Sequence, residues 1–174
     1  MGHDKFKDIR FIIYIAEIIG FFTIQRSFNI IYDILGIKPY VLIPIFISIG
    51  MLEGGNAGLV FGCIIGFLID ICGGSIFGFW MIILSVLGSV IDFLIDEEMF
   101  TNIITFSVVS LASLIIIFGF DFLFNFIILG HKDRLFAFCN TYLLKLLYTF
   151  LISPLFYLFN RTIYFAISED EGEF

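Results

Sequence analysis

Residues 54–78 read GGNAGLVFGCIIGFLIDICGGSIFG and carry a small or polar residue at every fourth position. Side chains four apart share one face of an α-helix, and each step of four rises about 6 Å along the axis. Because Ile, Leu, Val and Phe fill most of the positions between, the run predicts a membrane helix with a shallow groove along one face. The members of this glycine row are Gly54, Gly58, Gly62, Gly66, Asp70, Gly74 and Gly78.

The groove of small residues has two interpretations. In lipid, helices gain little from the hydrophobic effect when they associate, so rows of small residues let backbones approach and make van der Waals contact. Packing within the protein is the favoured interpretation, and a contact with another protein is the alternative. The sequence leaves open which way the groove faces.

Asp70 interrupts the row with a carboxylate. The paired Gly73 and Gly74 that follow permit a tight reversal into the next helix. We expect Asp70 to cap that turn by accepting backbone N–H groups. Handling of ions or protons is the less favoured role, because no second acid stands nearby in the sequence.

The composition indicates an integral membrane protein. Of the 174 residues, 60% are hydrophobic and 14% are charged, whereas a soluble domain has about half and a quarter. Long apolar runs leave little sequence for a soluble domain.

Much of the net charge of −7 comes from the acidic end SEDEGEF, which argues against a nucleic-acid partner. Cys63, Cys72 and Cys139 lack the spacing of a metal site or a disulfide framework.

Six apolar segments are expected to form helices, because backbone in a bilayer must satisfy its own hydrogen bonds. The second and third are shorter than the ~20 residues of a full span, so they are tilted little, shielded by protein or extended by flanking residues. The fifth is longer than a span needs, so it is expected to tilt or project. The segments lie near residues 9–25, 40–51, 55–72, 76–95, 100–129 and 135–157.

The predicted fold is an all-α polytopic membrane protein with six transmembrane helices. It forms one domain over residues 1–167, followed by an acidic disordered tail over residues 168–174. An even number of spans places both termini on one side, and the basic N-terminus favours the cytoplasm.

Asp121 and Lys145 lie at matching depth in the fifth and sixth segments, counted from the connection between them. Opposite charges at one depth in antiparallel helices predict an ion pair, and a proton relay is the alternative.

The sequence contains no HExxH, no GxSxG and no glycine-rich phosphate loop followed by Lys-Ser/Thr. We therefore expect a protein that is not an enzyme, with no catalytic residues, no metal and no cofactor.

The run GLVFGCIIGFLIDICGGSIFGFWMIILSVLGSVI, residues 58–91, resembles the rod shape-determining protein MreD family. Members of that family carry a Gly-xxx-Gly-xxx-Gly-xxx-Asp run, then a turn of small residues, then a Gly that precedes a hydrophobic helix. The stretch CNTYLLKLLYTFLISPLFYLFNRTIYF, residues 139–165, is similar to the family's last helix, with Pro154 ahead of the basic Arg161. The chain departs from the family where members often carry basic residues, at Glu53, Asp96, Glu97 and Glu98.

The resemblance implies a six-helix scaffold subunit of the bacterial rod, or elongation, complex in the cell membrane. Its implied partners are MreC and, indirectly, MreB, the glycosyltransferase RodA and a class B penicillin-binding transpeptidase. The implied role is to organise peptidoglycan synthesis and cell shape. The family is also regarded as similar in fold to the S components of energy-coupling-factor transporters.

A vitamin-binding S component is therefore the alternative function. Ala16 and Gly20 form a small-xxx-small pair like the one with which such proteins contact their transporter partner. A vitamin pocket needs several convergent polar groups, and the loops offer few beyond Asn29, Asp33 and Ser75.

Overall fold

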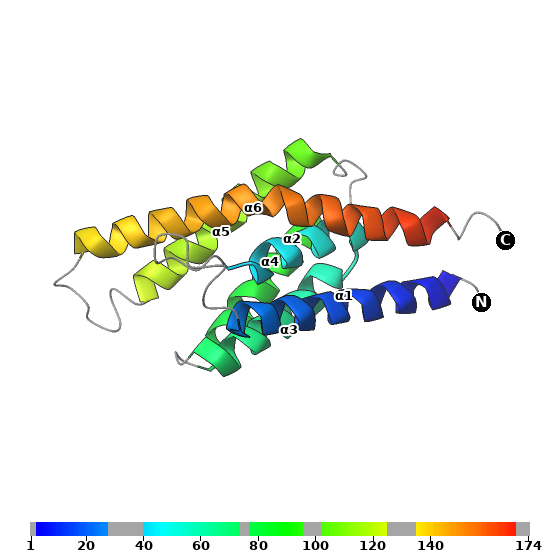
Figure 1. The fold of residues 1–174 in the computed structure, drawn as a ribbon, viewed down its shortest axis with the longest axis horizontal. Coiled ribbons are helices and arrows are strands. Elements are labelled where there is room, and N and C mark those ends of the chain that lie inside the picture. Colours follow the sequence, from blue (N-terminus) through cyan, green and yellow to red (C-terminus); the bar gives the residue numbers. More distant parts are fainter. Residues whose placement is uncertain (1–2, 28–39, 74–76, 96–101, 125–134, 170–174) are drawn as a thin grey trace.

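The computed structural model describes residues 3–27, 40–73, 77–95, 102–124 and 135–169, which fold into helices with no strand among them (Figure 1). The all-α prediction is therefore confirmed for these residues. The helices are α1 (His3–Ser27), α2 (Leu42–Glu53), α3 (Ala57–Gly73), α4 (Phe79–Ile95), α5 (Ile103–Leu123) and α6 (Leu135–Glu169).

Helix α2 forms the centre of the molecule. It contacts each of the other five helices, and every side chain from Leu42 to Leu52 is buried. A helix that is hydrophobic all round must be buried on all sides or lie in lipid. Protein therefore shields this short segment, which was one of the three arrangements expected from its length.

Successive helices run in alternating directions. The start of α1 meets the end of α2 through Arg10 and Glu53, and the end of α4 meets the start of α3 through Asp92 and Gly58. The start of α1 and the end of α6 also lie at this end of the molecule (Figure 1). At the opposite end, the last turn of α5 meets the first half of α6 through Asp121 and Tyr142.

Two helices are long and apolar enough to cross a membrane by length and composition, at Ile103–Leu123 and Thr141–Ile167. These two candidate spans support a membrane protein. The apolar helices α2, α3 and α4 are shorter, with 12, 17 and 17 residues. Six full spans thus remain a prediction.

Helix α6 is the longest helix among the described residues. Residues 100, 101 and 125–129 of the predicted fifth segment lie outside the described residues. Helix α5 has 21 residues, about 31 Å, which matches a hydrocarbon core of about 30 Å. Helix α6 has 35 residues and continues through Pro154 to Glu169, so the predicted end near Tyr157 is wrong. The helix also includes Ser168 and Glu169 of the predicted tail, and the rest of that tail lies outside the described residues.

Helix α6 tolerates Pro154 because a neighbouring hydroxyl replaces the missing donor. A proline has no N–H for the carbonyl four residues earlier, which here belongs to Phe150. The Ser153 hydroxyl donates to the Phe150 carbonyl oxygen at 2.8 Å. In membrane helices, Ser and Thr hydroxyls commonly donate to the carbonyl group that a proline leaves without a donor.

We expect Ser153→Ala to lower the free energy of unfolding by about 1 kcal/mol or more, because the Phe150 carbonyl loses its donor. In a Pro154→Ala background the same change should cost much less, since the introduced alanine supplies a backbone N–H. Thermal unfolding of the single and double variants in detergent measures both losses. Equal losses in the two backgrounds would contradict this role for Ser153.

Candidate functional site

The glycine row of α3 packs against the backbone of α4. A Cβ atom added to Gly58 would lie 2.6 Å from the carbonyl oxygen of Gly88, and one added to Gly62 would lie 2.5 Å from that of Leu84. At Gly66 the added atom would overlap the backbone of Met81. The groove therefore faces inward and its space is taken by α4. This result settles the open orientation in favour of packing within the protein.

Gly88 is the matching small residue on α4. A Cβ atom there would overlap the backbone of Gly58, so close approach depends on glycine in both helices. A polar contact also crosses this seam, since the Cys63 sulfur and the Ser85 hydroxyl oxygen lie 2.9 Å apart.

The two ends of the glycine row lie outside α3. Gly54 follows the last residue of α2 with φ +60°, and Gly78 precedes α4 with φ +95°. Only glycine adopts such angles without strain, so these two positions make turns rather than the groove. Helix α3 ends at Gly73, and Gly74 lies outside the described residues.

Asp70 caps the N-terminus of α4. One carboxylate oxygen accepts the backbone N–H groups of Gly78 and Met81, each at 3.0 Å, and the other accepts that of Trp80 at 3.0 Å. The first N–H groups of a helix have no partner within the helix, and a negative charge there also complements the helix dipole. The predicted capping role is confirmed.

Asp92 makes the reciprocal contact at the other end of the α3–α4 pair. Its two carboxylate oxygens accept the backbone N–H groups of Gly58 at 2.8 Å and Leu59 at 2.9 Å. Each helix thus carries, near its C-terminus, the aspartate that caps the other. In the sequence, Asp92 is a single charge within the apolar run of residues 76–95, and no pattern there indicates a capping role.

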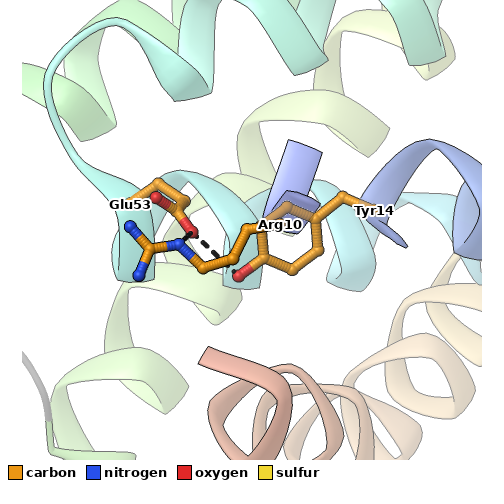
Figure 2. A network of polar contacts seen from close by, with 3 residues as sticks. All are labelled: Arg10, Tyr14 and Glu53. Atoms are coloured by element: carbon orange, nitrogen blue, oxygen red, sulfur yellow. Dashed lines mark hydrogen bonds and ion pairs between the residues drawn. The ribbon is translucent and has the colours of Figure 1, made fainter. Parts of the chain in front are cut away.

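A second polar cluster ties α1 to α2. Figure 2 shows Arg10 and Tyr14 converging on Glu53. The Arg10 Nε lies 3.0 Å from the Glu53 Oε1, and the Tyr14 hydroxyl donates to the same oxygen at 3.1 Å. The Arg10 guanidinium also lies 4.9 Å from the ring centroid of Tyr164 on α6. The cluster joins three helices at the end of the molecule that holds the start of α1 and the end of α6.

A cavity of about 310 Å³ opens beside this cluster. Phe11, Val60 and Phe61 line its apolar part, and Glu53 and Asn56 are among its polar lining residues. Tyr14 also lines the cavity, and its hydroxyl and Glu53 are already bound to each other, so such a cavity can hold an apolar group beside Asn56.

Asp121 and Lys145 meet through aromatic rings and not in the predicted direct ion pair. The Tyr142 hydroxyl donates to the Asp121 carboxylate at 2.8 Å. The Lys145 ammonium lies 5.6 Å from the ring centroid of Tyr142 and 5.7 Å from that of Tyr40. The two residues share a neighbour as predicted from their matching depth, but no direct ion pair joins these two described side chains, and Tyr142 contacts both instead.

We expect Tyr142→Phe to lower the free energy of unfolding by about 1–2 kcal/mol, because the buried Asp121 carboxylate loses a hydroxyl donor. The Phe ring still offers Lys145 a face. Thermal unfolding in detergent measures the loss. Tyr148→Phe, a tyrosine on the same helix, is the control; a loss of equal size there would contradict a specific role for Tyr142.

Among the residues that the structure describes, no group of three or more His, Cys, Asp and Glu side chains is placed to hold a metal ion. Of the aspartates above, Asp70 and Asp92 are bound to backbone N–H groups and Asp121 to a tyrosine hydroxyl. These hydrogen bonds hold the helices together.

Comparison with known proteins gives no match to this chain among protein-family models, curated proteins or solved structures. The resemblance to the MreD family therefore depends on the residues quoted for it, among them Gly58, Gly62, Gly66 and Asp70 of α3.

Proposed function

We propose that the protein is a membrane scaffold subunit of the bacterial rod complex, in the manner of the MreD family. The observation that carries the proposal is the α3–α4 pair. Gly58, Gly62 and Gly66 pack on α4, and Asp70 caps its start. Residues that define the resemblance in sequence thus act together in one structural unit.

A six-span arrangement with both termini in the cytoplasm is part of the proposal. Large apolar side chains are exposed on every helix except α2, which is buried. In water such a surface would drive aggregation, whereas in a bilayer it faces lipid. The alternating directions of the helices also agree with successive crossings of a bilayer.

The proposed role is to bind MreC and, through it, to organise the filament protein MreB and the peptidoglycan synthases. The Gly58–Gly66 face is not available for this contact, because α4 occupies it. The outer face of α6 offers a ridge of exposed leucines for a partner helix, at Leu143, Leu147, Leu151, Leu155 and Leu158.

Co-purification with MreC from the same organism tests the proposal. Full-length protein in mild detergent should retain MreC, and depletion of the protein should round rod-shaped cells. Leu151→Trp should weaken the capture, because the larger side chain blocks the α6 ridge. Ile12→Trp on α1, where the native side chain is similarly exposed, should retain it.

Failure to capture MreC together with normal cell shape after depletion would overturn the proposal. A vitamin that raises the melting temperature of the purified protein by several degrees would favour the S-component function instead.

A further inference from the structure

Glu17 is a buried carboxylate in the interface between α1 and α6. Its two oxygens are shielded from solvent, and neither has a hydrogen-bond partner among the described residues. Burial of an ionised carboxylate without a partner is costly in water and more so in a membrane. The arrangement therefore requires either a donor or a neutral acid at this position.

Asn160 of α6 is the polar side chain beside Glu17. Its amide nitrogen donates to the Ser48 hydroxyl oxygen on α2 at 2.6 Å, and the Ser48 hydroxyl hydrogen is directed to the Ile45 carbonyl oxygen at 2.8 Å. Because Ser48 has a single hydrogen, the amide atom facing it must be the donor nitrogen. The Asn160 Oδ1 is buried and likewise has no donor within the part of the chain that the structure describes.

The surroundings in the described helices supply no other donor. Glu17 lines a groove of about 320 Å³ whose other walls are apolar side chains, among them Ile13, Phe159 and Ile163. The two Glu17 oxygens and the Asn160 Oδ1 are thus buried acceptors without a donor among the described residues.

Among the side chains that the structure describes, the charged and titratable groups on the elements around Glu17 have other contacts. Arg10 and Tyr14 bind Glu53, and Asp70 on α3 caps α4. On α6, Tyr157 stacks on Phe106, Arg161 lies over Phe165, and Tyr164 lies under Arg10.

We propose that Glu17 is a proton-binding site, carried as the neutral acid in the interface between α1 and α6 beside Asn160. The proton comes from bulk water and forms one O–H bond on the carboxylate, so the site changes its charge by one unit. The site lies beside Asn160, whose amide nitrogen donates to Ser48 and so joins α6 to α2. Packing of α1 against α6 therefore depends on this proton.

The sign of the pH dependence follows from this linkage. An unfolded, solvated glutamate is ionised at neutral pH, whereas the folded protein holds the proton. Stability therefore falls as the pH rises, because folding then requires proton uptake.

Infrared spectroscopy of the full chain in detergent tests the protonation state directly. The wild type at neutral pH should show a C=O stretching band of a protonated carboxylic acid that is absent in Glu17→Gln. If the wild type and Glu17→Gln differ only in the carboxylate bands, Glu17 is ionised and the proposal is wrong.

Thermal unfolding gives an independent measurement. Glu17→Gln, a neutral side chain of the same shape, should melt close to the wild type at acidic pH. It should melt about 3 °C or more above the wild type at alkaline pH. The matched control Glu53→Gln removes an ion-paired carboxylate and should melt lower than the wild type at neutral pH. The proposal fails if Glu17→Gln is destabilised at all pH values as Glu53→Gln is at neutral pH.

Discussion

Replacement of Asp70 by alanine is expected to lower the free energy of unfolding by about 3 kcal/mol or more. The three backbone N–H groups at the start of α4 lose their acceptor, and each unsatisfied buried donor costs about 1–3 kcal/mol. Asp70 is only 6% exposed, so water cannot take its place. The change also removes a negative charge from the positive end of the α4 dipole. Circular dichroism during heating in detergent measures the loss.

Related variants separate the cap from other effects. Asp70→Asn keeps one oxygen acceptor in the same shape and should lose less than Asp70→Ala. Asp92→Ala should also lower the free energy of unfolding, because two backbone N–H groups of α3 lose their acceptor. The two sites lie at opposite ends of the helix pair, so their losses should add. If Asp70→Ala melts at the same temperature as the wild type, the Asp70 cap contributes little to stability.

The parts of this molecule that could be predicted from the sequence are those set by residues close together in the chain. Gly58, Gly62 and Gly66 share a face because of helical periodicity alone. Asp70 lies eight residues before Gly78, within one helix–turn–helix unit, so its capping role required only that the chain reverse. Both features depend on local geometry that the sequence displays directly.

Contacts between distant segments could not be predicted in the same way. Tyr14 and Glu53 are 39 residues apart, and their contact depends on how α1 and α2 pack. Asp92 caps α3 only because the glycine seam fixes the alignment of the two helices. A matching aspartate near the end of α4 was the available signal, since antiparallel helices place the C-terminus of each beside the N-terminus of the other.

The prediction for Asp121 and Lys145 shows that the depth of two charges in their helices is not enough to predict a direct contact between them. Position along an apolar segment gives the depth of a charge but not its direction around the helix axis. Tyr142 lies three residues before Lys145 and therefore on the same face of α6. The Tyr142 hydroxyl, and not the Lys145 ammonium, binds Asp121, and the Tyr142 ring faces that ammonium.

Complete burial of α2 is also a tertiary property. Its residues are as apolar as those of the lipid-facing helices, so composition does not separate a helix covered by protein from one covered by lipid. The short length of the segment was the informative feature. A helix of 12 residues, about 18 Å long, does not cross a hydrocarbon core of about 30 Å in direct contact with lipid.

Gly62→Leu is expected to lower the free energy of unfolding by about 3 kcal/mol or more, beyond the usual cost of a larger side chain in a core. The first added carbon would already lie 2.5 Å from the Leu84 carbonyl oxygen and 3.1 Å from the Phe46 ring. Backbone atoms cannot rotate away as a side chain can, so α3 and α4 must separate. The reciprocal caps at Asp70 and Asp92 would then lengthen together.

Gly20→Leu is the matched control, since it makes the same change at a glycine within a helix. A Cβ atom at Gly20 would meet nothing within 4 Å, and leucine is favoured over glycine in a helix by somewhat under about 1 kcal/mol. Gly20→Leu should therefore keep or raise the melting temperature, whereas Gly62→Leu lowers it. If both variants melt alike, close approach of α3 and α4 is not what the glycine row provides. If only Gly62→Leu is destabilised, the row acts within the protein, and a partner must bind another face.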